Sequence, residues 1–206
     1  MIEPCDLSAT QARRMIRSKE LSPVELLESC LRRTDDTNGA LNAVVTRVDE
    51  MAMTDAKRKE QEVIDGLFLG PLHGLPVAIK DLQPTAGILT TYGSQYFADH
   101  IPVADAGIVK RVRTNGGVVT GKTNIPEMSI GANTVNRLFG ATGNPFDPTK
   151  TCGGSSGGSA VAVATGMASL ATGSDHGGSL RIPACYSGVV GHRSSPGMVP
   201  HELRTI

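Results

Sequence analysis

Two glycine-rich segments each carry a serine in surroundings that suit nucleophilic chemistry. The first segment is Gly153–Ser159 (GGSSGGS), the second is Gly177–Ser179 (GGS), and 24 residues separate Ser155 from Ser179. Glycine allows positive φ and lets a ligand approach the backbone, and clustered amides can face an anion. A serine in such a loop lies beside hydrogen-bond donors, as an acyl-transfer nucleophile and its oxyanion require. The expected donors are the backbone N–H groups of His176, Gly177, Gly178 and Ser179.

A serine nucleophile needs a base at neutral pH, and Lys80 is the strongest candidate. It ends the apolar run Val77–Lys80, which we interpret as a buried strand. Burial lowers the pKa of a lysine, and a neutral amine can act as a general base. The hydroxyl of Ser155 could then relay a proton from Ser179 to Lys80. In the other interpretation, Lys80 is a surface residue paired with Asp81.

A Ser-His-Asp triad is the alternative to a lysine base. The sequence has five histidines, but it contains no GxSxG elbow that would present a serine nucleophile to one of them. His176 adjoins the second glycine segment, where we expect it to shape the rim of the loop. A flexible Gly/Ser linker would also be rich in these residues, but the apolar runs around Val161 and Ile182 disfavour it.

The elements between these residues are expected to form an α/β sheet core. Residues 160–164 read as a helix after the first glycine segment, and 167–172 as a strand that leads into the second. One helix and one strand would bring both serine loops to the same end of a sheet. Further strands are expected at 43–46, 77–80 and 117–120, alternating with helices at 49–64 and 105–114.

Two capping boxes predict the first two helices. Ser8 stands three residues before Gln11, and Ser22, followed by a proline, stands three residues before Glu25. Serine at the N-cap and Glu or Gln three residues later satisfy orphan amides at a helix start. We expect Asn38-Gly39 to end the second helix.

Composition indicates one globular domain with neither a nucleic-acid nor a membrane partner. The 206 residues are 39% hydrophobic and 19% charged, and 20 basic residues balance 20 acidic ones. No apolar run reaches the ~18 residues of a membrane span, and the N-terminus lacks a signal-peptide pattern. The four cysteines are scattered without metal-ligand spacing, so we expect a reducing cytoplasm, no metal and no other cofactor.

The segment Gly116–Thr123 (GGVVTGKT) fits the GxxxxGK[ST] pattern of a phosphate-binding loop. That motif needs a strand before the loop and a helix after it. Here a helix is expected before the segment, Val118-Val119 read as a strand, and Pro126 follows closely. Nucleotide binding is therefore not expected at this segment.

Four motifs together resemble those of the amidase signature family, the Ser-cisSer-Lys amide hydrolases. They are Gly74–Asp81 (GLPVAIKD), Gly121–Glu127 (GKTNIPE), Gly153–Ser159 and Asp175–Pro183 (DHGGSLRIP). The resemblance covers nearly the whole chain, and the combination of motifs is specific. It implies an α/β fold with a mixed central sheet flanked by helices.

The resemblance also implies a Ser–Ser–Lys triad. Lys80 matches the family's base, Ser155 the bridging serine on a cis peptide bond, and Ser179 the nucleophile. The nucleophile would attack an amide carbonyl, expel ammonia or an amine, and leave an acyl-enzyme for water to hydrolyse. Ser156, Asp175 and Arg181 match supporting positions.

Family members are considerably longer than this chain. We therefore expect 1–206 to be the N-terminal part of a single amidase domain, truncated at the C-terminus. Within it, 1–66 would be a helical lead-in and 67–206 a portion of the catalytic core. The shortfall leaves open whether this chain alone is active, so an inactive fragment is one alternative function.

The second alternative is the glutaminase subunit of a tRNA-dependent amidotransferase. That subunit tends to carry Asp at the position of Pro126 and Gln at that of Ile182, so the sequence favours a stand-alone hydrolase of small-molecule amides. The acyl group is not specified by the sequence. The assembly is open as well, and a homodimer is one option.

Overall fold

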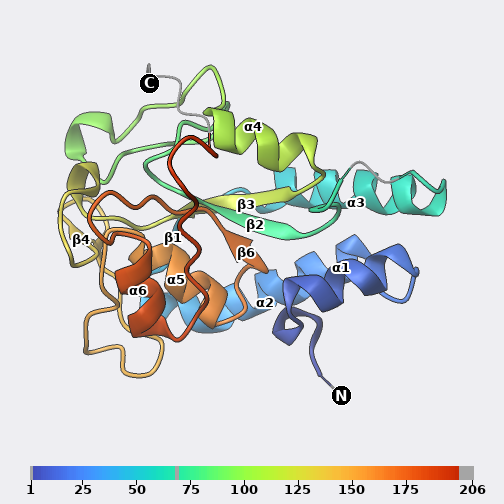
Figure 1. Cartoon of the computed structure of the whole chain (residues 1–206), viewed down its shortest axis with the longest axis horizontal. Helices are drawn as coiled ribbons and strands as arrows, with labels where there is room; N and C mark the ends of the chain where they lie inside the picture. The colour runs from blue at the N-terminus through green and yellow to red at the C-terminus, as the bar shows by residue number, and fades with distance from the viewer. Residues whose placement is uncertain (1, 68–69, 200–206) are drawn as a thin grey trace.

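A four-stranded mixed sheet forms the centre of the computed structural model, which describes residues 2–67 and 70–199 (Figure 1). The strand order is β1-β3-β2-β6. The strand β2 is parallel to both β3 and β6, and β1 is antiparallel to β3. The strands are β1 (Val44–Arg47), β2 (Pro76–Lys80), β3 (Val118–Thr123) and β6 (Leu170–Ala171), with a separate hairpin of β4 (Val135–Asn136) and β5 (Gly140–Ala141). The predicted α/β fold with a mixed sheet is confirmed.

Helices cover both faces of this sheet (Figure 1). The α-helices are α1 (Ala9–Arg17), α2 (Pro23–Leu41), α3 (Asp49–Ile64), α4 (Gly107–Thr114), α5 (Gly157–Ala164) and α6 (Arg181–Ser187). Short 3-10 turns are η1 (Pro4–Asp6), η2 (Gln95–Phe97) and η3 (Glu127–Ser129). The predicted lead-in, 1–66, also contributes β1 to the sheet, so it is not purely helical. Its division from 67–206 stays a prediction, and 68–69 and 200–206 lie outside the described residues.

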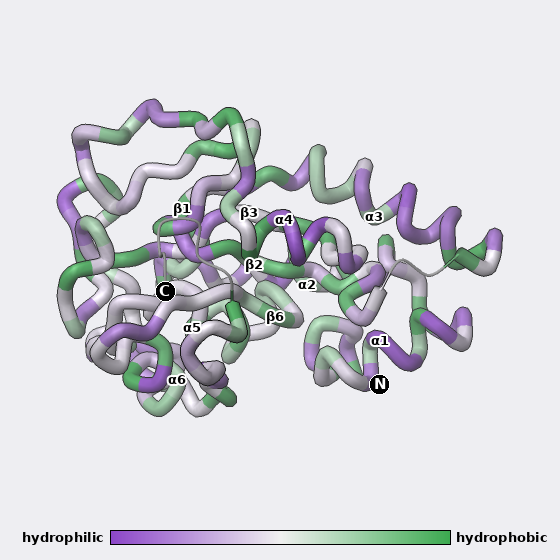
Figure 2. The backbone as a smooth tube through the Cα atoms, turned by 45° about the horizontal axis from the view of Figure 1, so that its top comes forward, coloured by the Kyte–Doolittle hydropathy of each residue, from purple (hydrophilic) through white to green (hydrophobic). Residues whose placement is uncertain are grey.

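The two faces of the sheet have separate apolar cores. On one face, Val77 and Ile79 of β2 pack with Val109 and Val112 of α4. On the other, Val118 packs with residues of α2 and α3, and α5 has its own core with the end of α2. In Figure 2 the strand β2 is predominantly hydrophobic, whereas α3 is largely hydrophilic. No helix among the described residues has the length and apolar character needed to cross a membrane.

The predicted helix starts are confirmed, but the predicted end of α2 is wrong. Ser8 and Ser22 are N-caps in complete capping boxes. The helix continues past Asn38 and Gly39 to Leu41, because the Asn38 side chain bonds the following backbone rather than breaking the helix. Its Oδ1 accepts from the amides of residues 43 and 44, at 2.9 Å each. The helix then stops at Asn42, which is left-handed.

The glycines in the first turn of α5 allow two other backbone segments to approach closely. A Cβ added at Gly158 would lie 2.4 Å from the Asn124 amide nitrogen and 2.6 Å from the Ala43 carbonyl oxygen. The helix begins at Gly157, three residues earlier than predicted, so both glycines belong to its first turn. β6 has two residues where six were expected, and α4 begins at Gly107 rather than Asp105.

Candidate active site

Lys80 lies fully buried at the carboxyl end of β2, as the strand prediction required. Its Nζ donates to Ser155 Oγ and to Ser174 Oγ, at 2.8 Å each. Its backbone amide donates to Thr172 Oγ1 at 2.9 Å. Burial lowers the pKa of the Lys80 ammonium to about 7, opposed by the charge of Asp175. An amine that is about half neutral at pH 7 can accept a proton from the adjacent hydroxyl.

Ser155 is buried in the first glycine loop, directly before α5. The Gly154–Ser155 peptide bond is cis, as the resemblance implied. Gly153 is left-handed, with φ of 78°, and a Cβ at Gly154 would lie 2.9 Å from the amide nitrogen of Asn133. The loop therefore has no room for larger residues at these glycines, and it holds the Ser155 hydroxyl against the lysine.

Ser179 lies in the neighbouring loop, half-buried and just before α6. The backbone amide of Ser156 donates to the Ser179 carbonyl oxygen at 2.9 Å. The Ser156 hydroxyl joins the same loop by accepting from the Ser174 amide at 3.3 Å and donating to the Ser174 carbonyl at 3.4 Å. The two serine loops thus lie side by side. Among the described residues, Ser179 is joined to the Lys80–Ser155 pair through this backbone, not by a side-chain hydrogen bond.

Asp175 braces the loop that carries Ser179. Its carboxylate accepts from the Gly178 amide at 2.8 Å, and Arg181 donates to it through Nε at 2.9 Å and Nη2 at 3.0 Å. Leu180 and Arg181 also donate their backbone amides to it. The Arg181 guanidinium, with these amides, holds the pKa of the Asp175 carboxyl well below its usual range. A carboxylate with so many donors stays ionised and orders the turn.

One predicted oxyanion donor needs correction. The amide of Gly178 is already used by Asp175, because the short turn between them folds back onto the carboxylate. The amides of His176, Gly177 and Ser179 remain the candidate donors. His176 and Gly177 are exposed, as expected for the rim of a site.

Two contacts of the site were missed from the sequence. Ser174 provides the second acceptor for the Lys80 ammonium, and it directly precedes the motif residue Asp175. It lies three residues after β6 and just outside the motif, so no motif position marked it in the sequence. Arg193 adds a second cation to Asp175, with Nε donating to the Asp175 carbonyl at 3.4 Å. Arg193 is in the C-terminal segment, for which no element was predicted.

The apparent phosphate-binding loop is a strand. Residues Val118–Thr123 form β3, and no helix follows Lys122 in the manner of a phosphate-binding loop. Lys122 is fully buried in the sheet instead of facing a ligand loop. A phosphate-binding loop needs a strand before it and a helix after it, whereas here the helix α4 precedes the segment and the segment itself is largely the strand β3.

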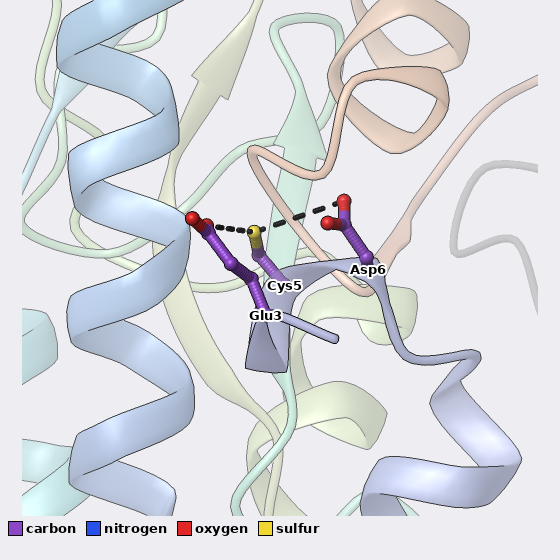
Figure 3. Close-up of side chains that lie close together, drawn as sticks. All are labelled: Glu3, Cys5 and Asp6. Atoms are coloured by element: carbon purple, nitrogen blue, oxygen red, sulfur yellow. Dashed lines mark hydrogen bonds between the residues drawn. The ribbon is translucent and has the colours of Figure 1, made fainter. Parts of the chain in front are cut away.

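Glu3, Cys5 and Asp6 bring two carboxylates and a thiol together near the N-terminus (Figure 3). The Cys5 thiol lies 3.6 Å from Glu3 Oε2 and 4.0 Å from Asp6 Oδ1. Arg33 forms ion pairs with Glu3 at 3.4 Å and with Asp6 at 3.0 Å. Burial raises the pKa of the Cys5 thiol, which disfavours the thiolate a metal would need. This group is best explained as an ion-pair cluster that ties η1 to α2.

Comparisons with known proteins give one family. A family model described as Amidase matches residues 25–203. The chain is 42% identical over 185 residues to a glutamyl-tRNA(Gln) amidotransferase subunit of Sulfurihydrogenibium sp. (strain YO3AOP1), covering 90% of this chain and 38% of that protein. It is also 42% identical over 197 residues to an acylamidase of Rhodococcus erythropolis, covering 96% of this chain and 41% of that protein.

A solved structure shares the fold. A bacterial aryl acylamidase, described as one of the amidase signature enzymes, matches with a TM-score of 0.84 at 33% identity, covering 88% of this chain and 38% of that one. The chain thus spans 38 to 41% of the length of these relatives. The matched residues include both glycine loops and the strand that ends in Lys80. The chain belongs to the amidase signature family.

Proposed function

We propose that this chain carries the catalytic residues of an amide hydrolase, with Ser179 as nucleophile, Ser155 as proton relay and Lys80 as base. The observation that carries the proposal is the 2.8 Å hydrogen bond between Lys80 Nζ and Ser155 Oγ, made by a fully buried amine with a pKa of about 7. A lysine with an ordinary pKa would be protonated at pH 7 and could not accept the proton.

The proposed reaction begins when Ser179 Oγ attacks the amide carbonyl. Its proton passes to Ser155 Oγ while the Ser155 proton passes to the neutral Lys80 amine. The negative charge on the carbonyl oxygen is stabilised by the amides of His176, Gly177 and Ser179. The proton then returns along the same route to the leaving nitrogen, and ammonia or an amine departs from an acyl-Ser179. Water hydrolyses the acyl group with Lys80 again as the base.

The substrate class we propose is a small linear amide, hydrolysed by a cytoplasmic protein. Identity does not separate the two branches, because an acylamidase and an amidotransferase subunit match equally, at 42%. Two residues favour the stand-alone hydrolase. Pro126 and Ile182 stand where the amidotransferase subunit tends to carry Asp and Gln, and Ile182 packs its apolar side chain against Gly153 and Gly178. A homodimer is the assembly we would test first.

Ammonia release from simple aliphatic and aromatic amides tests the proposal. We expect turnover by the wild type and a loss of at least about 10³-fold in Ser179→Ala and in Lys80→Met. Ser18→Ala, at an exposed position after α1, is the matched control and should retain the wild-type rate. Equal rates for the wild type and Ser179→Ala would contradict the proposal and favour the alternative, a catalytically inactive fragment.

A further inference from the structure

The proposed reaction makes no use of a second fully buried lysine, Lys122 on β3. Its Nζ donates to the Gln83 carbonyl oxygen at 2.6 Å, to Thr85 Oγ1 at 2.9 Å and to Thr90 Oγ1 at 2.8 Å. An ammonium has three N–H donors, so each of them has a partner. The Asp81 carboxylate, 4.0 Å away, balances the charge. Every one of these groups belongs to the segment 81–90, which directly follows the proposed base.

The two lysines point to opposite faces of the sheet. Lys122 pairs in register with Ile79, whereas Lys80 pairs with Thr123. Ile79 packs against α4, and Thr123 Oγ1 lies 2.6 Å from Ser159 Oγ of α5. Paired residues share a face and successive residues alternate. Lys122 therefore lies on the α4 face, and Lys80 lies on the α5 face with the serine loops.

An irregularity in β3 produces this arrangement. The register shifts between Val77 and Ala78, where Thr120 is skipped and Gly121 takes the next place. Such a bulge reverses the facing of the residues that follow it. Without it, Lys122 would point to the α5 face and Thr123 to the α4 face. Gly121 is the residue that fits there, because a Cβ would lie 2.2 Å from the Thr46 carbonyl oxygen.

Gln83 connects the two faces over the end of the sheet. Its backbone carbonyl accepts from Lys122, while its side-chain Oε1 accepts from Thr172 Oγ1 at 2.5 Å. Its Nε2 donates to the Gly173 carbonyl at 3.4 Å. Thr172 Oγ1 in turn accepts the Lys80 amide at 2.9 Å. A continuous hydrogen-bonded path thus runs from Lys122, through Gln83, to the backbone of Lys80 and to the residue before Ser174.

We propose that Lys122 and Gln83 are positioning residues, which fix the segment 81–90 and the Gly173–Ser174 backbone so that the Lys80 amine stays enclosed and aligned on Ser155 and Ser174. Lys122 does this through its three hydrogen bonds to the segment 81–90, and Gln83 carries its effect across the sheet edge. The catalytic meaning of this alignment rests on the proposed function. The alignment itself does not, and it can be measured separately.

The experiment follows the titration of Lys80 in the whole chain, with ¹³C-labelled lysine and NMR. In Lys122→Ala and in Gln83→Leu, a looser segment admits water to Lys80, so its pKa should rise by at least about one unit toward the ordinary value. The side-chain atoms that Lys122→Ala removes are those of n-propylammonium, so adding this cation should restore the wild-type titration of Lys80. The uncharged n-propanol, of similar size, should not restore it. Lys110→Ala, on the exposed face of α4, is the control and should leave Lys80 unchanged.

A Lys80 titration identical to wild type in a folded Lys122→Ala or Gln83→Leu chain would overturn the proposal, as would equal rescue by n-propanol. If Lys122→Ala does not fold, Gln83→Leu decides, because it removes only the link. The readout needs no turnover. If the wild type shows no amide hydrolysis but the Lys80 pKa still rises in the variants, the proposed function is refuted and the positioning role is supported. Where hydrolysis is measurable, kcat should fall with KM little changed.

Discussion

Replacing Lys80 by methionine should stabilise the fold in neutral and acidic solution, although it removes the proposed base. The Lys80 amine is fully buried, and burial lowers its pKa from 10.5 to about 7. The protonated amine is therefore disfavoured in the folded chain but not in the unfolded chain. Methionine has a similar length and no charge, so Lys80→Met removes this penalty.

The sign and size of the effect follow from proton linkage. Between pH 7 and 10.5 the unfolded chain binds the Lys80 proton and the folded chain does not, so wild-type stability rises with pH. The full penalty applies below pH 7 and disappears above 10.5. The stability advantage of Lys80→Met should therefore shrink by about 3 kcal/mol from about pH 6 to about pH 9.5. Lost hydrogen bonds to Ser155 and Ser174 lower the advantage by an amount independent of pH.

Urea unfolding followed by circular dichroism measures this difference at about pH 6, 8 and 9.5. The matched control is Lys110→Met, since Lys110 is exposed and its substitution should give a difference that is constant with pH. An advantage of Lys80→Met that is constant across this range, or that grows with pH, would refute the reasoning.

Three further predictions concern Lys80, Asp175 and the glycines of α5 and α2. Because the base must be neutral, kcat/KM for amide hydrolysis should fall about tenfold per unit below pH 7 and level off above it; a flat profile from about pH 5 to 7 would contradict Lys80 as base. Asp175→Asn should lower the free energy of unfolding by about 1–3 kcal/mol at neutral pH. This difference from the wild type should shrink in acid, as the wild-type carboxylate protonates, and denaturant midpoints measured from neutral to acidic pH check it. Gly158→Ala should lower the free energy of unfolding by about 1–3 kcal/mol through overpacking, whereas Gly39→Ala, at an open position on α2, should raise it by about 0.5–1 kcal/mol. Melting temperatures measure both changes, and a higher melting temperature for Gly158→Ala than for Gly39→Ala would contradict this prediction.

Local signals in the sequence were sufficient to predict the starts of α1 and α2 and the strand that ends in Lys80. The capping boxes at Ser8 and Ser22 depend only on neighbouring residues, so they could be read directly. The end of α2 could not, because Asn38 bonds to residues 43 and 44 only once the following strand turns back. The same holds for β6, whose two residues are defined by pairing with β2 rather than by their own apolar run.

The residues of the candidate site that lie in motifs could be predicted from the sequence, whereas those brought there only by packing were missed. Lys80 and Ser155 stand in glycine-rich or apolar motifs, and the structure brings them to 2.8 Å. Ser174 and Gln83 lie just outside the motifs, so no motif position marks them in the sequence. Their contacts arise because strands β2 and β6 meet at one end of the sheet. The face on which Lys122 lies depends on the bulge in β3, so simple alternation along the strand would place Lys122 on the wrong face.

Labelling with a serine-reactive fluorophosphonate, followed by peptide mass spectrometry, measures whether Ser179 is a nucleophile activated through Ser155 and Lys80. We expect a single adduct on Ser179, formed at a rate that rises with pH through about 7 and that falls sharply in Ser155→Ala and Lys80→Met. Labelling at another serine, or labelling of Ser179 at the same rate in these variants as in the wild type, would contradict it.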